Sequence, residues 1–355
     1  MTRPQTGPRV LYRADGSPEI GTGHIIRGLI LRRRLDAMGA RVVFLTRDLR
    51  WGAQKLRDAG AEVLLLPADA DDRAQSAAIR KAAPDGCVMD VLETPQALTA
   101  AARDAGAAVV CLDDVGSGRL NANAIINILE VEPAPEALVE RGIALYQGPE
   151  YAALPEAYAE PGIAEREIPQ KVCRILVTLG GADPAGLAPK AARALRSALA
   201  DARAGWAFED AHATLLVGSA SGYRAQVMEA VRGAEASFTV SDSIPSLLPA
   251  LRAADLGIIA GGLTMHEALA VGLPSIALCQ PVRHQAELAQ RFADQGAMLT
   301  LGPGAAVSEA QIADAVLALA CAADRRRRLA GAGPRLVDGR GAQRTAEAIL
   351  HAAAV

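Results

Sequence analysis

A glycine-rich stretch with a single histidine lies near the start of the chain, between an apolar run and a helical pattern. It reads Gly21-Thr22-Gly23-His24, and Arg27 follows about one helical turn later. Glycines let a backbone approach a ligand closely, and the first turn of a helix offers N–H groups and a positive dipole end to anionic oxygens. The dipole also disfavours the charged form of a histidine in that turn. His24 is therefore a candidate for an uncharged general base.

Two ordinary interpretations compete with a catalytic role for this motif. A glycine-rich turn between a strand and a helix is common in parallel-sheet proteins, and a histidine at a helix start is often only solvated. The spacing also differs from the dinucleotide-binding fingerprint, because the third glycine is absent. The motif alone leaves its function open, and a second motif in the other half of the chain favours the functional interpretation.

That second motif is another glycine-rich turn, Gly261-Gly262, which also lies between an apolar run and a helical pattern. Its backbone could wrap an oxygen-rich group, and Thr264 could cap the helix or donate to a phosphate. Glu267, one turn into the helix, could accept hydrogen bonds from ribose hydroxyls. The competing interpretation is a capping box, with Thr264 as N-cap and Glu267 as the third helical residue. Gln285, at the start of a later helix, could add polar contacts in the same place.

The elements that must position these motifs follow from the alternation of short apolar runs with helical patterns, which is typical of a parallel sheet flanked by helices. The pattern pauses at a proline-containing segment, 151–171, and then restarts. We therefore predict two α/β domains, 1–160 and 172–355, each with ligands at the carboxyl ends of its strands. The last helix, after Gly341, is expected near the domain junction. The predicted strands are 9–13, 41–46, 62–66, 86–90, 108–112 and 124–128 in the first domain, and 174–179, 212–217, 235–240, 255–259, 273–278 and 297–301 in the second.

Composition excludes several classes of protein. At 355 residues the chain is too long for one ordinary core, and a hydrophobic content of 51% excludes a disordered protein. A net charge of −3 gives no basis for binding nucleic acid or an anionic membrane, and the basic run 325–328 is expected to be a solvated helix face. The five cysteines have no metal-ligand or redox spacing, which favours a reducing compartment and no metal site. The sequence shows no signal-like or membrane-spanning apolar segment, so we expect a cytoplasmic protein without membrane insertion.

Further short motifs accompany the two glycine-rich turns along nearly the whole chain. They are Arg13-x-Asp15, Asp113-Asp114, Gly148-x-x-Tyr151, Gly180-Gly181-x-Asp183 and Asp338-Gly339-x-Gly341-Ala342-x-Arg344. Together with the turns, this set resembles that of GT-B-type nucleotide-sugar proteins. More narrowly, it resembles the UDP-sugar hydrolases of the pseudaminic-acid pathway, which act on UDP-2,4-diacetamido-2,4,6-trideoxy-β-L-altropyranose, and the related spore-coat polysaccharide biosynthesis proteins.

The resemblance implies a fold, a reaction and a site. The fold would be α/β and GT-B-like, with two Rossmann-like parallel-sheet domains facing a cleft. His24 would activate water for attack on the anomeric carbon of a UDP-linked deoxyamino sugar, releasing UDP without a metal or an organic cofactor. The sugar would lie on the N-terminal domain and UDP on the C-terminal domain, with uracil near Ser243-Ile244. The implied sugar-binding residues are Arg13, Asp15, Gly21, Gly23, Arg27, Asp113 and Tyr151, and the implied nucleotide-binding residues are Gly180, Gly181, Ile244, Gly261, Gly262, Thr264, His266, Glu267 and Gln285.

The chain departs from this family at three places. It has Asp90-Val91-Leu92 where the hydrolases often carry Asp-His-Tyr, Pro155 where an arginine is usual, and His266 in place of an asparagine. The missing tyrosine argues for a different sugar, or for transfer to an acceptor other than water. A glycosyltransferase with the same UDP-sugar donor is therefore the alternative enzyme, and a non-catalytic nucleotide-sugar-binding protein is a third possibility. The histidine of the first motif speaks against a pure binder, which needs no base; in each case we expect a monomer or a weak homo-oligomer whose partner is a UDP-sugar.

Overall fold

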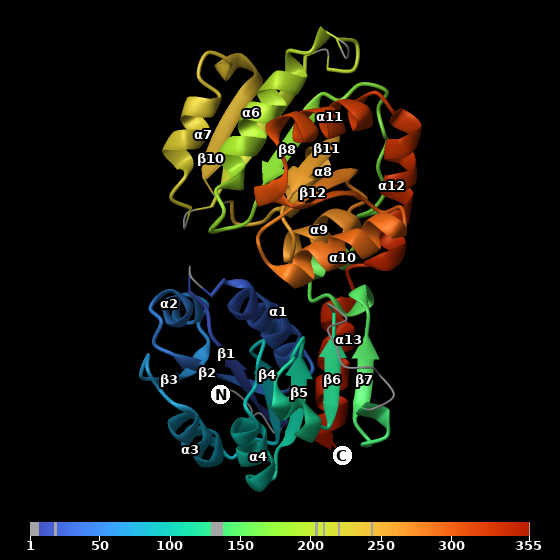
Figure 1. Ribbon diagram of the computed structural model, residues 1–355. Helices are drawn as coiled ribbons and strands as arrows, with labels where there is room; N and C mark the ends of the chain where they lie inside the picture. The colour runs from blue at the N-terminus through green and yellow to red at the C-terminus, as the bar shows by residue number, and fades with distance from the viewer. Residues whose placement is uncertain are drawn as a thin grey trace, which may run out of the picture. The chain divides into compact units, whose positions relative to one another are not determined.

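The structure, a computed structural model, describes residues 7–17, 20–128, 138–202, 205–208, 210–218, 221–242 and 244–354. The chain divides into two compact units (Figure 1). Unit 1 comprises Met1–Pro155 and Arg340–Val355, and unit 2 comprises Glu156–Gly339. Each unit is built on one sheet, and neighbouring strands within each sheet run parallel.

Unit 1 has a seven-stranded sheet with helices on both faces. In spatial order its strands are β3 (Glu62–Leu66), β2 (Arg41–Arg47), β1 (Arg9–Ala14), β4 (Gly86–Asp90), β5 (Ala108–Leu112), β6 (Ala124–Asn127) and β7 (Ala144–Gln147). Its helices are α1 (Gly23–Ala37), α2 (Trp51–Asp58), α3 (Asp72–Ala82), α4 (Gln96–Asp104) and α13 (Gly341–Ala354). Alternate residues of a strand point to opposite faces. Val10 and Tyr12 therefore pack with α1, α2 and α13, whereas Leu11 packs with α3 and α4.

Unit 2 has a six-stranded sheet of the same kind. In spatial order its strands are β10 (Phe238–Asp242), β9 (His212–Val217), β8 (Arg174–Thr178), β11 (Leu256–Ile259), β12 (Ser275–Cys279) and β13 (Leu299–Pro303). Its helices are α6 (Leu187–Leu199), α7 (Arg224–Ala230), α8 (Leu248–Ala253), α9 (Leu263–Ala270), α10 (Arg283–Asp294), α11 (Glu309–Ala320) and α12 (Ala323–Leu336). Ile175 and Val177 of β8 form a core with Leu195 of α6 and Val316 of α11.

The prediction of two parallel-sheet α/β domains is confirmed, and the division after Pro155 falls inside the proline-containing segment. Every strand predicted from an apolar run has a counterpart in the structure. Among the described strands, β7 alone has no such prediction. It lies at the edge of the sheet, its residues are exposed or half-buried, and the apolar run that marks it, Ile143–Tyr146, is only four residues long.

The last helix differs from the prediction that 172–355 form one domain. α13 belongs to unit 1, where Ala346 and Ile349 join the core of the first sheet. Gly341, the first residue of this helix, lies very close to Ala152. A Cβ added at Gly341 would come within 2.1 Å of the carbonyl oxygen of Ala152. Thr345 also donates to the carbonyl of Tyr151, at 3.0 Å. The apolar face of the helix and this close backbone approach therefore hold it in unit 1, and its local sequence does not say which sheet it covers.

The basic run 325–328 is not wholly the solvated face that its charge suggests, because Arg326 is fully buried. Its guanidinium donates to the carbonyls of Leu319 and Ala320, at the end of α11, and to those of Pro169 and Gln170. Carbonyls at a helix C-terminus lack intrahelical partners and carry partial negative charge, so they compensate a buried cation. The other three arginines of the run are exposed.

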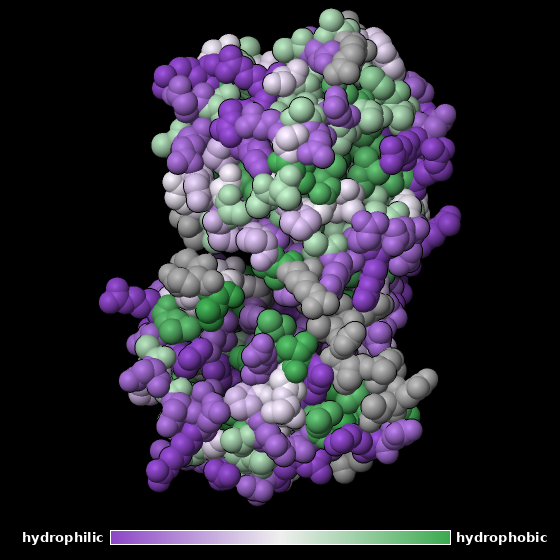
Figure 2. Space-filling model, in the orientation of Figure 1, coloured by the Kyte–Doolittle hydropathy of each residue, from purple (hydrophilic) through white to green (hydrophobic). Residues whose placement is uncertain are grey.

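The surface is mainly hydrophilic on the face drawn in Figure 2, and apolar side chains appear there in separate patches. Ile20, Val139 and Trp206 are large apolar side chains that are more than half exposed. Within the described ranges, no helix combines the length and the apolar character needed to span a bilayer.

The substitution Ile349→Ala tests the assignment of α13 to unit 1. It removes a buried side chain from the core of the first sheet, so we expect a loss of about 2–5 kcal/mol in the free energy of unfolding. Urea denaturation followed by circular dichroism measures the loss. His351→Ala, at an exposed position of the same helix, should change the free energy of unfolding by less than about 0.5 kcal/mol. Equal effects of the two substitutions would contradict this packing.

Candidate functional site

His24 lies in the first turn of α1, at the carboxyl edge of the unit 1 sheet. The loop before it closes through a hydrogen bond from the backbone N–H of Ser17 to the carbonyl of Gly21, at 3.2 Å, and Gly21 has a φ of +91° that favours glycine. Gly28, one turn further, packs on the rings of Tyr12 and Phe44; an added Cβ would come within 2.8 Å of each. This glycine lets α1 approach β1 closely, and the approach brings His24 to the end of the neighbouring strand β4.

Asp90, the last residue of β4, is the partner that His24 meets there. Its Oδ1 lies 2.7 Å from Nδ1 of His24, and its Oδ2 accepts from the hydroxyl of Tyr12 at 2.6 Å and from Nε of Arg27 at 3.0 Å. A second guanidinium nitrogen of Arg27 donates to Oδ1. Burial by itself would raise the pKa of this fully buried carboxyl, but Arg27 and His24 outweigh burial and hold the pKa well below its usual range.

The ionised carboxylate of Asp90 determines which nitrogen of His24 carries a proton. A carboxylate only accepts hydrogen bonds, so Nδ1 of His24 must donate. In the neutral ring, Nε2 is then the nitrogen with a lone pair, and the side chain of His24 is about a quarter exposed, at 27%. This is the arrangement of a general base oriented by a buried acid.

Arg27 links this pair to a second acid, because it also donates to the carboxylate of Asp113. Asp113 follows β5 with a φ of +48°, and its Oδ1 accepts from the backbone N–H of Ile128 at 2.7 Å. The structure therefore brings together three predicted residues, His24, Arg27 and Asp113. Arg27 is buried and engaged with both acids, so it positions Asp90; its predicted contact with a sugar stays a prediction.

Asp90 is the functional candidate that sequence reasoning missed, since Asp90-Val91-Leu92 figured there only as a departure from a family pattern. A usable signal was present. A carboxylate that ends a fully buried strand lies at the carboxyl edge of the sheet, where ligands of parallel sheets bind. What the sequence does not reveal is that β4 pairs directly with β1, the strand before the histidine loop.

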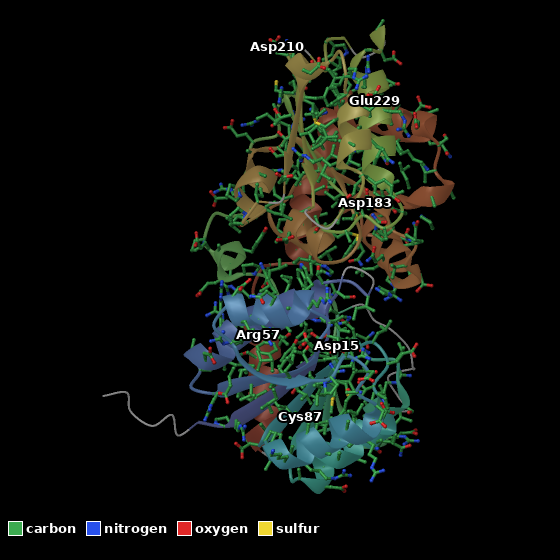
Figure 3. The ribbon with its side chains drawn as sticks, turned by 90° about the vertical axis from the view of Figure 1, so that its left-hand side faces the viewer. Asp15, Arg57, Cys87, Asp183, Asp210 and Glu229 are labelled. Carbon is green, nitrogen blue, oxygen red and sulfur yellow. The ribbon has the colours of Figure 1, made fainter. Side chains whose placement is uncertain are left out.

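Arg13 and Asp15 lie on a different part of the same edge. Nε of Arg13 donates to Gln75 of α3, at 2.9 Å, so Arg13 points to the face opposite α1. Asp15, which is labelled in Figure 3, accepts from Arg13 and from Nε of Arg47, each at 2.7 Å. Burial would raise the pKa of Asp15, but the two arginines lower it to about 2. These residues form a buried ion cluster, and their predicted role in sugar binding stays a prediction.

Tyr151, the remaining predicted sugar ligand with a large side chain, is half-buried beside Tyr146, with ring centroids 5.8 Å apart. Burial raises the pKa of its hydroxyl above the usual value. It lies after β7, whereas the acids around His24 lie at the end of β4 and directly after β5. The contact of Tyr151 with a sugar stays a prediction.

In unit 2, the predicted nucleotide residues gather at the carboxyl ends of four strands. Gly180 and Gly181 follow β8, Ile244 follows β10, Gly261 and Gly262 follow β11, and Gln285 lies in α10 after β12. Space is open at Gly180 and at Gly181, where an added Cβ would meet nothing within 4 Å. Ser243, which was expected near uracil with Ile244, lies outside the described residues.

The turn after β8 is held by Asp183, which is labelled in Figure 3. Its φ is +45°. Its carboxylate accepts from the backbone N–H groups of Leu187 and Ala188, at 2.9 Å each, and so caps α6. Gln280 bridges Asp183 to the carbonyl of Leu179 through its amide nitrogen, at 2.7 and 3.0 Å. These bonds fix the backbone of the glycine pair without using its own N–H groups.

The helix start after β11 corrects one interpretation from the sequence. Gly262, with a φ of +84°, is the N-cap of α9, and Thr264 is already inside the helix. Glu267 therefore lies beyond the first turn, and the capping box of Thr264 and Glu267 is wrong. Gln285 packs over Gly261, where an added Cβ would come within 2.5 Å of its Oε1. That oxygen is buried without a hydrogen-bond partner in the described structure, so it remains an acceptor for a ligand hydroxyl or a water.

His266 has a different surrounding from the other predicted nucleotide ligands. It is 1% exposed, its Nδ1 donates to the carbonyl of Gly262 at 3.1 Å, and its ring meets the ring of Phe292 edge-on at 5.6 Å. His266 thus supports the glycine turn from inside the unit. A direct contact with a nucleotide stays a prediction.

Glu267 carries the most perturbed carboxyl of this edge. It is half-buried, and its Oε1 accepts from the hydroxyl of Tyr158 at 2.8 Å. Burial raises its pKa to about 7, although the hydrogen bond from Tyr158 opposes the shift. No other group among the described residues donates to this carboxylate, so Oε2 keeps its capacity to accept.

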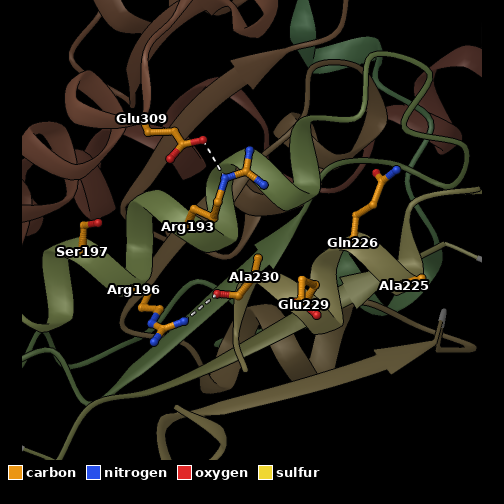
Figure 4. A pocket seen from close by; sticks show the side chains of 8 residues that line it. All are labelled: Arg193, Arg196, Ser197, Ala225, Gln226, Glu229, Ala230 and Glu309. Atoms are coloured by element: carbon orange, nitrogen blue, oxygen red, sulfur yellow. Dashed lines mark hydrogen bonds and ion pairs between the residues drawn. The ribbon is translucent and has the colours of Figure 1, made fainter. Parts of the chain in front are cut away.

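A surface hollow elsewhere in unit 2 does not compete with these sites. It lies among α6, α7 and α11, and Figure 4 shows its lining. Arg193 is paired with Glu309 at 2.7 Å, and Arg196 donates to the carbonyl of Ala230 at 3.3 Å, so its two cations already have partners. In the part of the chain that the structure describes, no group of three or more His, Cys, Asp or Glu residues is placed to hold a metal ion.

Comparison with known proteins adds a relative and confirms the fold. No protein-family model matches the chain. It is 27% identical over 331 residues to the spore coat polysaccharide biosynthesis protein SpsG of Bacillus subtilis, a match covering 92% of this chain and 94% of that protein. Among solved structures it is similar to Acinetobacter baumannii MurG (TM-score 0.70, 15% identity, 97% of this chain and 99% of that one). It is also similar to the S. aureus MnaA–UDP co-structure (TM-score 0.63, 11% identity, 95% and 94% of the two chains). These likenesses show the fold alone: the two Rossmann-like parallel-sheet domains form a GT-B-like fold, as predicted.

Glu267→Gln tests the raised pKa. The folded-state pKa of about 7 lies above the ordinary value of 4.5, so folding favours the protonated form and stability falls as the pH rises between those values. A glutamine keeps an acceptor for Tyr158 and cannot ionise. We expect a gain of about 2–4 °C in Tm at about pH 8, the shift that about 1 kcal/mol produces in a unit of this size, and no gain below about pH 5.

Thermal unfolding over that pH range measures the effect, and Glu229→Gln on the exposed side of α7 is the matched control. The control should show no gain that depends on pH. A uniform gain for Glu267→Gln at all pH values would contradict a carboxyl whose pKa is raised by burial.

Proposed function

We propose that the protein is a hydrolase that cleaves a UDP-linked sugar to the free sugar and UDP, with His24 as general base. The observation that carries the proposal is the hydrogen bond between His24 and the buried carboxylate of Asp90. A partly exposed base that is oriented by a buried acid fits a catalytic role better than a purely structural one. The likeness to SpsG, a polysaccharide biosynthesis protein, and to MnaA, which binds UDP, supports a nucleotide-sugar substrate. The sugar we propose is a deoxyamino sugar of the pseudaminic-acid precursor type, which is what the resemblance to those hydrolases implies.

In the proposed reaction, Nε2 of His24 takes a proton from water while the water oxygen attacks the anomeric carbon. The bond between that carbon and the oxygen of the β-phosphate breaks, and the oxygen leaves with UDP. Asp90 stabilises the imidazolium that forms, and Arg27 keeps Asp90 ionised through the cycle. The imidazolium then returns its proton to solvent.

For the nucleotide, we propose the carboxyl edge of unit 2. The backbone N–H groups at the start of α9, from Gly262 to Thr264, would hold the diphosphate, and Glu267 would accept from a ribose hydroxyl. The unpaired oxygen of Gln285 could accept from a second hydroxyl of the ligand. Gly180, Gly181 and Ile244 border the same edge.

The alternative is a glycosyltransferase that uses the same donor. A panel of UDP-sugars, incubated with the protein without an acceptor, separates the two reactions by the release of free UDP. Release without an acceptor supports the hydrolase, and release only after an acceptor is added supports the transferase. No release under either condition would overturn both.

His24→Ala and Asp90→Asn test the chemistry. We expect each to lower turnover by about 10²–10⁴-fold, the contribution of a general base, while UDP affinity stays nearly unchanged. In the second variant an amide replaces the acceptor-only carboxylate, so the ring nitrogen that faces the reaction is no longer specified. Turnover from UDP release and UDP affinity by calorimetry are measured on the same preparations.

His351→Ala, exposed on α13, is the control and should keep full turnover. If His24 only contacts a phosphate from the helix start, His24→Ala would lower UDP affinity instead. Turnover close to that of the wild type would remove His24 from the mechanism.

Glu267→Ala tests the nucleotide site. A hydrogen bond to a charged group contributes about 1.5–3 kcal/mol, so loss of the carboxylate should weaken UDP binding about ten- to a hundredfold. Calorimetric titration with UDP measures the affinity, and circular dichroism checks that the variant is folded. An unchanged affinity in a folded variant would leave Glu267 without a role in nucleotide binding.

A further inference from the structure

Tyr158 belongs to a short 3₁₀ segment, Glu156–Ala159, that opens unit 2, and no sequence motif pointed to it. Its side chain is 1% exposed, yet its hydroxyl reaches Oε1 of Glu267 at 2.8 Å. The two residues are 109 positions apart in the chain. A buried tyrosine usually needs a partner for its hydroxyl, but this one takes the carboxylate for which we propose ribose binding.

The hydroxyl of Tyr158 is held in place from two sides. Its ring is among the large side chains that are fully buried, so it cannot swing away from Glu267 without opening the core. Its backbone is held by Gly339, where an added Cβ would come within 2.1 Å of the carbonyl oxygen of Tyr158. Gly339 has a φ of +76°, which favours glycine and permits this approach. The donor is therefore fixed before any ligand binds.

We propose that Tyr158 is a positioning residue for ribose recognition: it occupies Oε1 of Glu267 and thereby sets Oε2 to accept from a single ribose hydroxyl. This inference rests on the proposed nucleotide site in unit 2. The last torsion of a glutamate side chain is broad, so an unheld carboxylate samples many orientations. A fixed donor on one oxygen selects one plane for the carboxylate and leaves the other oxygen as the acceptor.

The same hydrogen bond has an electrostatic effect. Tyr158 lowers the pKa of Glu267 against the effect of burial, and it is the one titratable group among the described residues that acts on that pKa. Removing the hydroxyl should therefore raise the pKa further. Over the neutral range, a smaller fraction of the protein would then carry the ionised carboxylate that accepts from ribose.

The experiment compares wild type, Tyr158→Phe and Glu267→Gln by calorimetric titration with UDP, 2′-deoxy-UDP and 3′-deoxy-UDP. In the wild type, we expect one of the two deoxy ligands to bind about tenfold more weakly than UDP, because the hydroxyl that contacts Glu267 is missing. In Tyr158→Phe, we expect UDP itself to bind about two- to tenfold more weakly, the scale of one ordinary hydrogen bond. The preference for UDP over that deoxy ligand should shrink in the same variant.

A pH series adds a second measurement, the pH midpoint of UDP affinity, which would not change if Tyr158 had only a structural role. In the wild type, UDP affinity should rise through about pH 7, where Glu267 ionises, and the midpoint should lie at a higher pH in Tyr158→Phe. Tyr146→Phe is the matched control, since it removes a hydroxyl from a half-buried tyrosine of unit 1. It should change neither the ligand preference nor the midpoint.

The outcomes separate this inference from the proposed function. If the wild type does not bind UDP, or if Glu267→Gln binds all three ligands as the wild type does, the proposed site itself is wrong. If Glu267→Gln abolishes the preference and Tyr158→Phe leaves both the preference and the midpoint unchanged, the site stands and the role of Tyr158 is overturned. If Tyr158→Phe weakens all three ligands equally with an unchanged midpoint, Tyr158 serves only packing, which also overturns the inference.

Discussion

The carboxyl edge of unit 1 is organised around one buried charge, the carboxylate of Asp90. A carboxylate removed from water is unfavourable unless cations and hydrogen-bond donors replace the lost hydration. Arg27 and His24 of α1 and Tyr12 of β1 supply those donors from two separate elements. Compensation of this charge therefore constrains how α1 sits against β1 and β4. The same constraint decides which nitrogen of His24 is left to face a substrate.

Unit 2 places a carboxyl in the opposite situation. Among the described residues no cation acts on Glu267, and the neutral hydroxyl of Tyr158 is its one donor. Asp90 is thus ionised at every physiological pH, whereas Glu267 exchanges its proton near neutrality. The surroundings of the two carboxyl groups thus give them different properties. Asp90 is a permanent charge that orients His24, whereas Glu267 is an acceptor whose ionisation changes with pH.

The sequence predicts those features that are local. Apolar runs and glycine turns predict all the described strands except β7, and the two α/β domains, because each depends on a few neighbouring residues. Asp90 and Tyr158 escape prediction because their importance depends on which strand or segment lies beside which, and their partners are distant in the chain. The capping-box interpretation of Thr264 fails for a related reason. The positive φ of Gly262 makes that residue the N-cap, and this shifts every later position of the helix.

α13 also escapes local prediction, since an amphipathic pattern does not say which sheet the helix covers. Its place in unit 1 means that the ribosome makes all of unit 2 before it makes the last helix of unit 1. Until then, the apolar face of the first sheet that α13 covers lies open. Domains of nascent chains generally fold in order from the N-terminus. Here unit 2 can be completed before unit 1, although the synthesis of unit 1 begins first. Until α13 is made, the nascent chain carries a first unit with an exposed apolar surface, which is the kind of surface that chaperones recognise.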